Sequence, residues 1–266
     1  MPEQAIEVRG LVKTFGSFTA VDGIDVDVPR GQVFGFLGPN GSGKTTTIRM
    51  LTGSIVPTTG QARVLGVDVI AHPERVRARI GYMSQKFSLF EDLTVAENLR
   101  FYAQIHGLGK EEFAERRGWI LRMAGLTGRE DELARNLSVG WRQRLSLGTA
   151  TIHSPELLFL DEPTSGVDPV ARRQFWELLY ELAEQGITLF VTTHYMDEAT
   201  HCNRLAFIYG GRLIARGTPT ELRDTFGPGA TLEDVFVGLE ERSRQAGSEA
   251  SRPGHPAGTG GPASPA

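Results

Sequence analysis

Apolar and polar residues alternate along the first part of the chain, in AIEVRGLV from residue 5 and in IDVDV from residue 24. This period of two predicts antiparallel strands with one buried face. The following run, VFGFL at 33–37, is apolar throughout, which predicts a strand buried on both faces. Gly23 and Gly31 mark turns between these segments. We therefore expect an antiparallel β subdomain that leads into one central strand.

Between residues 45 and 84, helix patterns alternate with strand patterns. Residues 45–53 predict a first helix, which Gly53 stops, and residues 61–70 return to a strand pattern. Residues 72–79 predict a short basic helix, followed by a strand at 80–84. This alternation is typical of an α/β core.

From Thr94 onward, about 60 residues have helical spacing and no strand signal. Thr94 is the expected N-cap of the first helix. One face of that helix carries Val95, Leu99, Tyr102 and His106. Glycines at 125, 128 and 140 predict breaks between helices. The pattern indicates a helical subdomain at about 86–154, inserted into the α/β core.

Strand signals return after residue 155, at 157–160, 187–193 and 204–209. A helix is expected from Pro169 to Gln185, with Asp168 as its N-cap and an apolar stripe of Ala171, Phe175, Leu178, Leu179 and Leu182. Another helix should follow His194. Strands that alternate with helices predict a mainly parallel sheet with right-handed crossovers.

The end of the chain has a different composition. Residues 231–242 predict a small terminal helix, which would complete one domain over 1–241. The segment 242–266 is rich in glycine, alanine, serine and proline, and such a composition buries too little apolar surface to order itself. We expect a disordered tail there.

Composition narrows the class of protein. The 266 residues are 40% hydrophobic and 23% charged, as in ordinary soluble globular proteins. No apolar run approaches the roughly 20 residues that span a bilayer, and the N-terminus lacks a signal-peptide pattern, so we expect a cytoplasmic protein. Cys202 is a single cysteine, which excludes an internal disulfide. The net charge of −4 disfavours nucleic acid as a partner, and any membrane association should come through another protein.

A phosphate-binding loop follows the apolar strand. The sequence GPNGSGKT matches the pattern GxxxxGK[ST], in which backbone N–H groups reach phosphate oxygens where side chains are missing. Lys44 adds a point charge, and the Thr45 hydroxyl is suited to bind Mg²⁺. The residues expected to contact a nucleoside triphosphate are Gly38, Pro39, Asn40, Gly41, Ser42, Gly43, Lys44, Thr45 and Thr46.

Further polar residues follow predicted strands and should meet this loop at the carboxyl edge of the sheet. Asp161 and Glu162 end the run LLFLDEP. Asp161 suits Mg²⁺ coordination, and Glu162 suits orienting or deprotonating an attacking water. Gln85 can contact Mg²⁺ or its waters. His194 can hydrogen-bond the γ-phosphate and hold Glu162 and the water in place.

Two interpretations stay open from the residues alone. Phe15, which precedes Gly16 in a turn, either stacks on adenine or packs in the core. His194, His201 and Cys202 permit a zinc site on one helix face, although three widely spaced ligands make a weak zinc pattern.

Taken in order, these motifs resemble the ATP-binding cassette of ABC transporters. The resemblance covers about residues 5–240 and rests on GPNGSGKTT, Gln85, LSVGWRQR at 137–144, LLFLDEP, SGVD at 165–168 and His194. It implies a P-loop NTPase core with ATP and Mg²⁺ as ligands, and Phe15 as the adenine-stacking aromatic. It also implies that Gln85, Glu162, Asp168 and His194 correspond to the family's Q-loop, catalytic glutamate, D-loop and switch histidine.

The signature segment departs from the family pattern LSGGQ, because Val139 and Trp141 replace a glycine and the glutamine. In the family, the signature of one subunit closes on the γ-phosphate held by another. Ser138 and Gly140, which remain, imply that this anion-binding chemistry survives. The stretches QKFSLFEDLTVAENL, HYMDEA and LEDVF resemble the branch that exports drugs and antibiotics.

The resemblance implies an ATP-hydrolysing subunit that pairs with a second cassette, which can be an identical copy, and drives export through a separate membrane permease. It would lie on the cytoplasmic face of the cell membrane, with 87–99 as the docking segment. Drug-like molecules, antibiotics, lipids and polysaccharides remain open as substrates. A soluble cassette ATPase that acts on ribosomes or nucleic acid is disfavoured by the single cassette and the negative charge. A non-catalytic sensor is disfavoured by Glu162 and His194.

Overall fold

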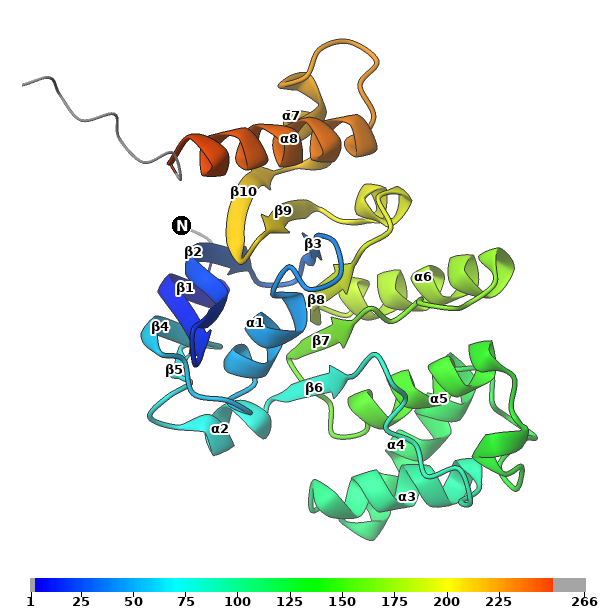
Figure 1. The fold of residues 1–266 in the computed structure, drawn as a ribbon. Coiled ribbons are helices and arrows are strands. Elements are labelled where there is room, and N and C mark those ends of the chain that lie inside the picture. Colours follow the sequence, from blue (N-terminus) through cyan, green and yellow to red (C-terminus); the bar gives the residue numbers. More distant parts are fainter. Residues whose placement is uncertain (1–2, 251–266) are drawn as a thin grey trace, which may run out of the picture.

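The computed structural model describes residues 3–250, which form two β-sheets and several groups of helices (Figure 1). The first sheet is antiparallel and has the strand order β2-β1-β4-β5. Its strands are β1 (Gln4–Phe15), β2 (Phe18–Pro29), β4 (Thr59–Val64) and β5 (Val67–Asp68). The antiparallel β subdomain expected from the alternating pattern is confirmed.

The second sheet has the order β10-β9-β3-β8-β7-β6, and all its pairs are parallel except that of β10 with β9. Its strands are β3 (Val33–Leu37), β6 (Ile80–Met83), β7 (Leu157–Asp161), β8 (Thr188–Thr193), β9 (Arg204–Tyr209) and β10 (Arg212–Gly217). Because β3, β6, β7 and β8 are parallel, their carboxyl ends open onto one edge of the sheet. The mainly parallel α/β core is confirmed.

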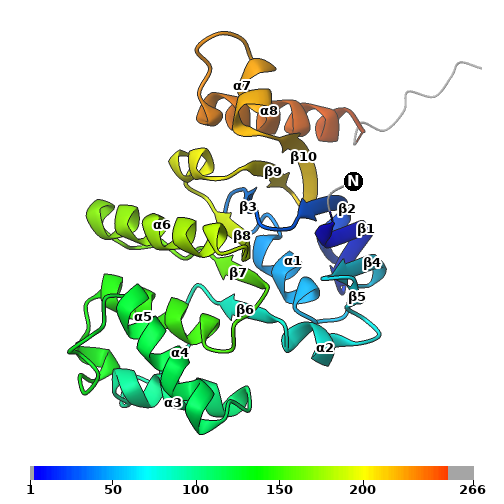
Figure 2. The ribbon, with the colours of Figure 1, turned by 180° about the vertical axis from the view of Figure 1, so that it is seen from behind.

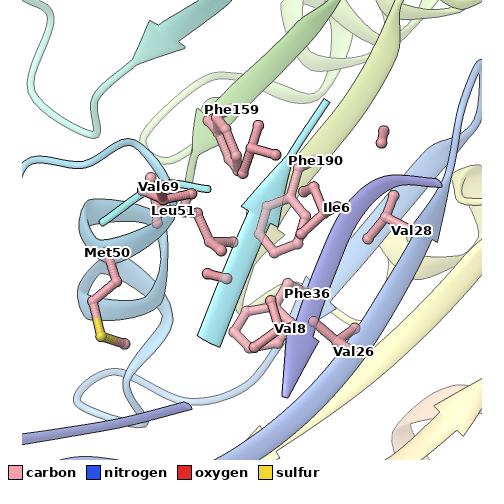
Figure 3. Packing of buried hydrophobic residues seen from close by; sticks show 14 of the residues in the cluster. Ile6, Val8, Val26, Val28, Phe36, Met50, Leu51, Val69, Phe159 and Phe190 are labelled. Carbon is pink, nitrogen blue, oxygen red and sulfur yellow. The ribbon is translucent and has the colours of Figure 1, made fainter. Parts of the chain in front are cut away.

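An apolar core lies between the two sheets (Figure 3). The rings of Phe36 and Phe159 lie 5.3 and 5.4 Å from the ring of Phe190, so aromatic contacts join three parallel strands. Ile6 and Val8 reach this core from β1. The helices α1 (Lys44–Leu51) and α2 (Pro73–Arg77) add further side chains to it. This packing fixes β3, and with it the loop that follows β3.

Helices α6 (Pro169–Glu184), α7 (Pro219–Asp224) and α8 (Leu232–Ala250) contribute to a second core, which includes residues of the parallel strands (Figure 2). Asp168 caps α6 by accepting hydrogen bonds from the N–H groups of Val170 and Ala171, as its sequence position predicts. Trp176, which was not part of the predicted stripe, is almost fully buried there.

Helices α3 (Val95–Ile105), α4 (Lys110–Met123) and α5 (Val139–Thr151) come between β6 and β7 in the chain. They lie beside β6, away from the antiparallel sheet, and have an apolar core of their own (Figures 1 and 2). Thr94 and Glu97 form a capping box at the start of α3. A short 3₁₀ helix, η1 (Ala134–Asn136), precedes α5.

Several elements differ from the sequence predictions. Gly140 does not break a helix, because it is the second residue of α5, where the first turn tolerates glycine. The helix expected after His194 is the 3₁₀ helix η2 (Asp197–His201). Strand β10 and helix α7 were not predicted. Both are short elements whose apolar side chains pack against the core.

The terminal helix is longer than predicted, since α8 continues to Ala250 and includes residues 242–250 of the expected tail. Arg244 in this extension contacts the Tyr209 hydroxyl and Glu240. Arginine, glutamine, glutamate and alanine favour helix, and extending a docked helix needs no new nucleation. The rest of the expected tail, 251–266, lies outside the described residues. Among the described residues, no helix is both long and apolar enough to cross a membrane.

Gly81 in β6 lies where α5 packs on the sheet, and a Cβ atom there would clash with the backbone oxygen of Ala150 and with the side chain of Leu158. We expect Gly81→Ala to lower the free energy of unfolding by about 1–3 kcal/mol through overpacking. Gly118→Ala is the matched control, because a Cβ at this helical position meets only the flexible Arg122 side chain. It should raise stability by about 0.5–1 kcal/mol. Urea titration would show both effects, and equal shifts would contradict the packing assignment.

His106, which follows α3, and His153, which follows α5, stack with ring centroids 3.6 Å apart and 2° between the ring planes. Nε2 of His153 donates to the Ile80 carbonyl at 2.9 Å. Burial, together with the neighbouring His106 and Arg116, lowers the pKa of His153 to about 4. The His153 ring is therefore neutral at pH 7 in the folded chain.

Acidification should weaken the fold through this ring. In the unfolded chain His153 has its ordinary pKa of 6.5, so it takes up a proton below that pH while the folded ring stays neutral down to about 4. Between pH 7 and 5, we expect the native chain to lose about 1–2 kcal/mol more unfolding free energy than His153→Gln. Glutamine keeps a donor for Ile80 and does not titrate. Urea titrations at both pH values test this, and equal losses would contradict it.

Candidate active site

The loop between β3 and α1 has no room for a side chain at two of its glycines, Gly38 and Gly43. A Cβ on Gly38 would clash with the backbone oxygen of Ile208, and one on Gly43 would lie 2.5 Å from the carbonyl oxygen of Ala20. Gly41 and Gly43 have φ angles of 79° and 108°, which favour glycine. The loop is therefore a backbone cradle that opens at the N-terminus of α1, where unpaired N–H groups attract anions.

The Lys44 ammonium is the charge at the centre of this cradle. Its side chain is 4% exposed, and Nζ donates to the carbonyl oxygens of Gly38 at 2.7 Å and Pro39 at 3.1 Å. Nζ also lies 3.1 Å from Oε1 of Glu162, whose side chain is 8% exposed. A buried charge needs a partner, and here a cation after β3 and a carboxylate after β7 neutralise each other.

Glu162 is held by groups from two other strand ends. Oε2 of Glu162 accepts a hydrogen bond from Nε2 of Gln85 at 3.1 Å and lies 3.0 Å from Nδ1 of His194. Its backbone has φ 48°, an uncommon value for a residue with a side chain. The Glu162 N–H donates to both the carbonyl and hydroxyl oxygens of Thr192 in β8, at 3.1 and 3.0 Å. Strand β8 thus fixes the strained turn that aims the carboxylate at Lys44.

Asp161 lies beside Glu162 and beneath Thr45. Oδ1 of Asp161 accepts a hydrogen bond from the Thr192 hydroxyl at 2.7 Å, and the Thr45 hydroxyl also hydrogen-bonds this carboxylate. Burial raises the pKa of Asp161, while the hydroxyl bonds oppose that rise. Hydroxyl and carboxylate oxygens are ligands that Mg²⁺ prefers, and a buried carboxylate gains from a nearby cation. The donor set therefore fits a magnesium ion.

Part of this site faces a cavity of about 410 Å³, which is lined by Phe18, Ala20, Asn40, Gly41, Gly43, Lys44, Thr45, Thr46, Gln85 and Glu162. The structure thus brings together the predicted residues of the loop, both carboxylates, Gln85 and His194. Phe15 does not line this cavity. Phe18 does, and it was missed, although it lies two positions from Ala20 in an alternating strand and so shares its face.

The signature residues lie elsewhere. Ser138 is the N-cap position of α5, and neither Ser138 nor Gly140 lines the cavity. A Cβ on Gly140 would lie 3.1 Å from Ala171, so α5 and α6 begin close together. Trp141 is flanked by the guanidinium groups of Arg129 and Arg144, whose central carbons lie 4.6 and 5.0 Å from its ring. Of the two departures, Val139 is therefore exposed on α5, whereas Trp141 is partly buried against the apolar core of the helical subdomain.

A buried polar cluster behind the site was also missed. Glu198 in η2 accepts a hydrogen bond from the Thr164 hydroxyl, and Arg172 in α6 lies 3.6 Å from the same carboxylate. Burial raises the pKa of Glu198, an effect that Thr164 opposes. Arg172 also lies over the ring of Tyr195, 4.4 Å from its centre. The cluster ties the segment after Glu162 to the segment after His194, and the only sequence signal for it is a glutamate inside a weakly helical stretch.

The zinc interpretation of His194, His201 and Cys202 is wrong. His194 faces Glu162, Nδ1 of His201 hydrogen-bonds the Tyr180 hydroxyl at 2.6 Å, and Cys202 is buried near the Glu198 carbonyl. Within residues 3–250, no group of three or more histidine, cysteine, aspartate or glutamate side chains is placed to hold a metal ion. The spacing suggested one helix face, but His194 precedes η2 and Cys202 follows it.

Comparison with known proteins gives the family. A family model described as ABC transporter matches residues 21–165. The probable multidrug ABC transporter ATP-binding protein YbhF of Escherichia coli is 45% identical over 89% of this chain, which spans 42% of that protein's length. The daunorubicin/doxorubicin resistance ATP-binding protein DrrA of Streptomyces peucetius is 44% identical over 85% of this chain and 69% of its own.

A solved structure of the ATP-binding subunit of an ABC transporter has the same fold. It superposes with a TM-score of 0.80 at 30% identity, and the match covers 88% of this chain and 99% of the other. The residues that the family model matches, 21–165, include the phosphate-binding loop, Gln85, Asp161 and Glu162. The chain therefore belongs to the ABC transporter family, as one of its ATP-binding domains.

Proposed function

We propose that this chain hydrolyses ATP and that the hydrolysis drives export through a separate membrane permease. The observation that carries the proposal is the buried cluster at the carboxyl edge of the sheet, in which Lys44, Gln85 and His194 all converge on Glu162. A site that only bound nucleotide would need the cradle and its lysine. It would not need a buried carboxylate that a histidine and a glutamine hold in place.

Lys44 has two interactions available, one with Glu162 and one with phosphate. When a triphosphate occupies the cradle, its oxygens offer the ammonium more negative charge than one carboxylate does. Glu162 is then released from the ion pair and retains His194 and Gln85 as neighbours. We propose that Glu162 orients and deprotonates the attacking water and that His194 positions both.

Mg²⁺ would be held by the Thr45 hydroxyl and the Asp161 carboxylate, with Gln85 close by. When bound, the ion neutralises charge on the β- and γ-phosphate oxygens. Thr192 supports this set, because its hydroxyl fixes Asp161 and its backbone carbonyl holds the Glu162 N–H.

We propose that Ser138 and Gly140 act on nucleotide bound to a second cassette, which can be an identical copy. They begin an exposed helix N-terminus, which suits an anion, and the cavity around Lys44 contains no residue from α5. Asp168 caps α6 immediately beside α5 and would face the same partner. The Gln143 side chain donates to the Pro163 carbonyl, which links α5 to the segment that follows Glu162.

The exporter part of the proposal rests on the relatives. YbhF is named a probable multidrug transporter protein and DrrA a resistance protein for daunorubicin and doxorubicin. For this chain we propose a drug-like or antibiotic substrate, a permease partner and a position on the cytoplasmic face of the membrane. The docking segment would be 87–99, where Phe90 is exposed and packs edge-on against Phe101 at 4.4 Å.

Replacing Glu162 with glutamine tests the catalytic proposal. The amide keeps an acceptor for Lys44 but cannot take a proton, so we expect ATP turnover to fall by at least about 100-fold. Binding of ATP should persist, because the cradle is unchanged. The measurement is phosphate release together with equilibrium nucleotide binding.

Glu177→Gln makes the same chemical change on the exposed face of α6 and should leave turnover as in the native chain. Undiminished hydrolysis by Glu162→Gln would contradict the role proposed for this carboxylate. Loss of ATP binding as well would show that the residue holds the cradle together and would assign no catalytic step to it.

A further inference from the structure

Glu198 is a buried carboxylate that contacts the two segments carrying Glu162 and His194. Its side chain, in the 3₁₀ helix η2, is 1% exposed. It accepts a hydrogen bond from the Thr164 hydroxyl, and the Thr193 hydroxyl also hydrogen-bonds it. Thr164 is two residues after Glu162, and Thr193 directly precedes His194. One carboxylate therefore joins two turns at the carboxyl edge of the sheet.

Arg172 extends this cluster from helix α6. Its Nε atom lies 3.6 Å from Oε1 of Glu198, and its guanidinium carbon lies 4.4 Å from the centre of the Tyr195 ring. The rings of Tyr195 and His194 are 4.1 Å apart, with 36° between their planes. The Tyr195 N–H donates to the Thr193 hydroxyl at 3.0 Å. Glu198 thus contacts the residue before His194 directly, and it reaches the residue after His194 through Arg172.

The position of Glu162 depends on this cluster when the carboxylate leaves Lys44. Buried charge networks often add little to stability, but they can fix one arrangement of the segments that they join. The segments joined by Glu198 carry Oε2 of Glu162 and Nδ1 of His194, which lie 3.0 Å apart. The ion pair with Lys44, at 3.1 Å, is the other charged contact of Glu162. A triphosphate that takes over Lys44 removes that contact, so His194 then does more of the holding.

We infer that Glu198 is a positioning residue, which holds the imidazole of His194 against Glu162 while ATP is hydrolysed. The inference rests on the proposed function, because its consequence is a faster hydrolysis step. Glu198 touches no reacting atom in this role and acts through His194. It also lies outside the cavity around Lys44. Its loss should therefore slow turnover and leave ATP binding intact.

Phosphate release per bound nucleotide, measured on the full chain, tests this role. Glu198→Ala should lower kcat at least about tenfold, with KM for ATP within about twofold of the native value. Glu198→Gln should recover most of the loss, because its amide oxygen still accepts from Thr164. Glu156→Ala is the control, since this carboxylate pairs with Arg30 and Arg79 at the amino end of β7. It should leave kcat within about twofold.

A double-mutant cycle shows whether Glu198 acts through His194. If it does, Glu198→Ala should have little further effect on kcat in a His194→Ala chain, whereas independent effects would multiply. Multiplied losses would overturn the inference, and so would an unchanged kcat in Glu198→Ala. Loss of ATP binding together with turnover would also overturn it, because the cluster would then only hold the fold together.

A readout without turnover separates this inference from the proposed function. Nitrogen NMR of the histidine-labelled chain reports the hydrogen bonding of the His194 ring, and His194→Ala identifies its signal. Glu198→Ala should shift this signal, and Glu156→Ala should not. If the native chain released no phosphate, the proposed function would fail, and a shifted signal would still support the positioning of His194 by Glu198. An unshifted signal would overturn the inference whatever the turnover.

Discussion

The buried ion pair between Lys44 and Glu162 constrains the rest of the site. The two charges follow different strands and lie 3.1 Å apart with almost no exposure to water. Such a pair is stable only where geometry and further hydrogen bonds compensate for lost hydration. The carbonyls of Gly38 and Pro39 complete the shell of the ammonium, and Gln85 and His194 complete that of the carboxylate. In the same position, the Lys44 ammonium could pair with a phosphate oxygen in place of the Glu162 carboxylate.

The parallel sheet makes this arrangement possible, because it delivers the ends of β3, β6, β7 and β8 to one edge. Contacts from that edge also reach the helices. Gln143 of α5 bonds the Pro163 carbonyl, and Glu198 joins Thr164 to the segment after His194. Short polar contacts therefore connect the segment after Glu162 to α5, α6 and η2.

Much of the fold and of the site could be predicted from the sequence, because both depend on local pattern. VFGFL is apolar throughout and LLFLD is apolar up to Asp161, and each is a fully buried parallel strand. Glu162 directly follows one of these strands, and Lys44 follows the other after the glycine loop. What the sequence did not predict depends on contacts between distant segments. Phe18 is recognised only when β2 is seen against the loop, and Glu198 only when η2 is seen against Thr164. The extension of α8 was not predicted, because the glycine and serine residues after 242 indicated a disordered tail. The helix includes these residues nevertheless.

The central question is whether nucleotide takes the place of Glu162 at Lys44. A crystal structure of the chain with Mg²⁺ and a non-hydrolysable ATP analogue measures this directly. We expect Nζ of Lys44 to contact a phosphate oxygen and to have moved out of contact with Oε1 of Glu162, while His194 stays beside the carboxylate. A nucleotide bound elsewhere, with Lys44 and Glu162 still 3.1 Å apart, would contradict it.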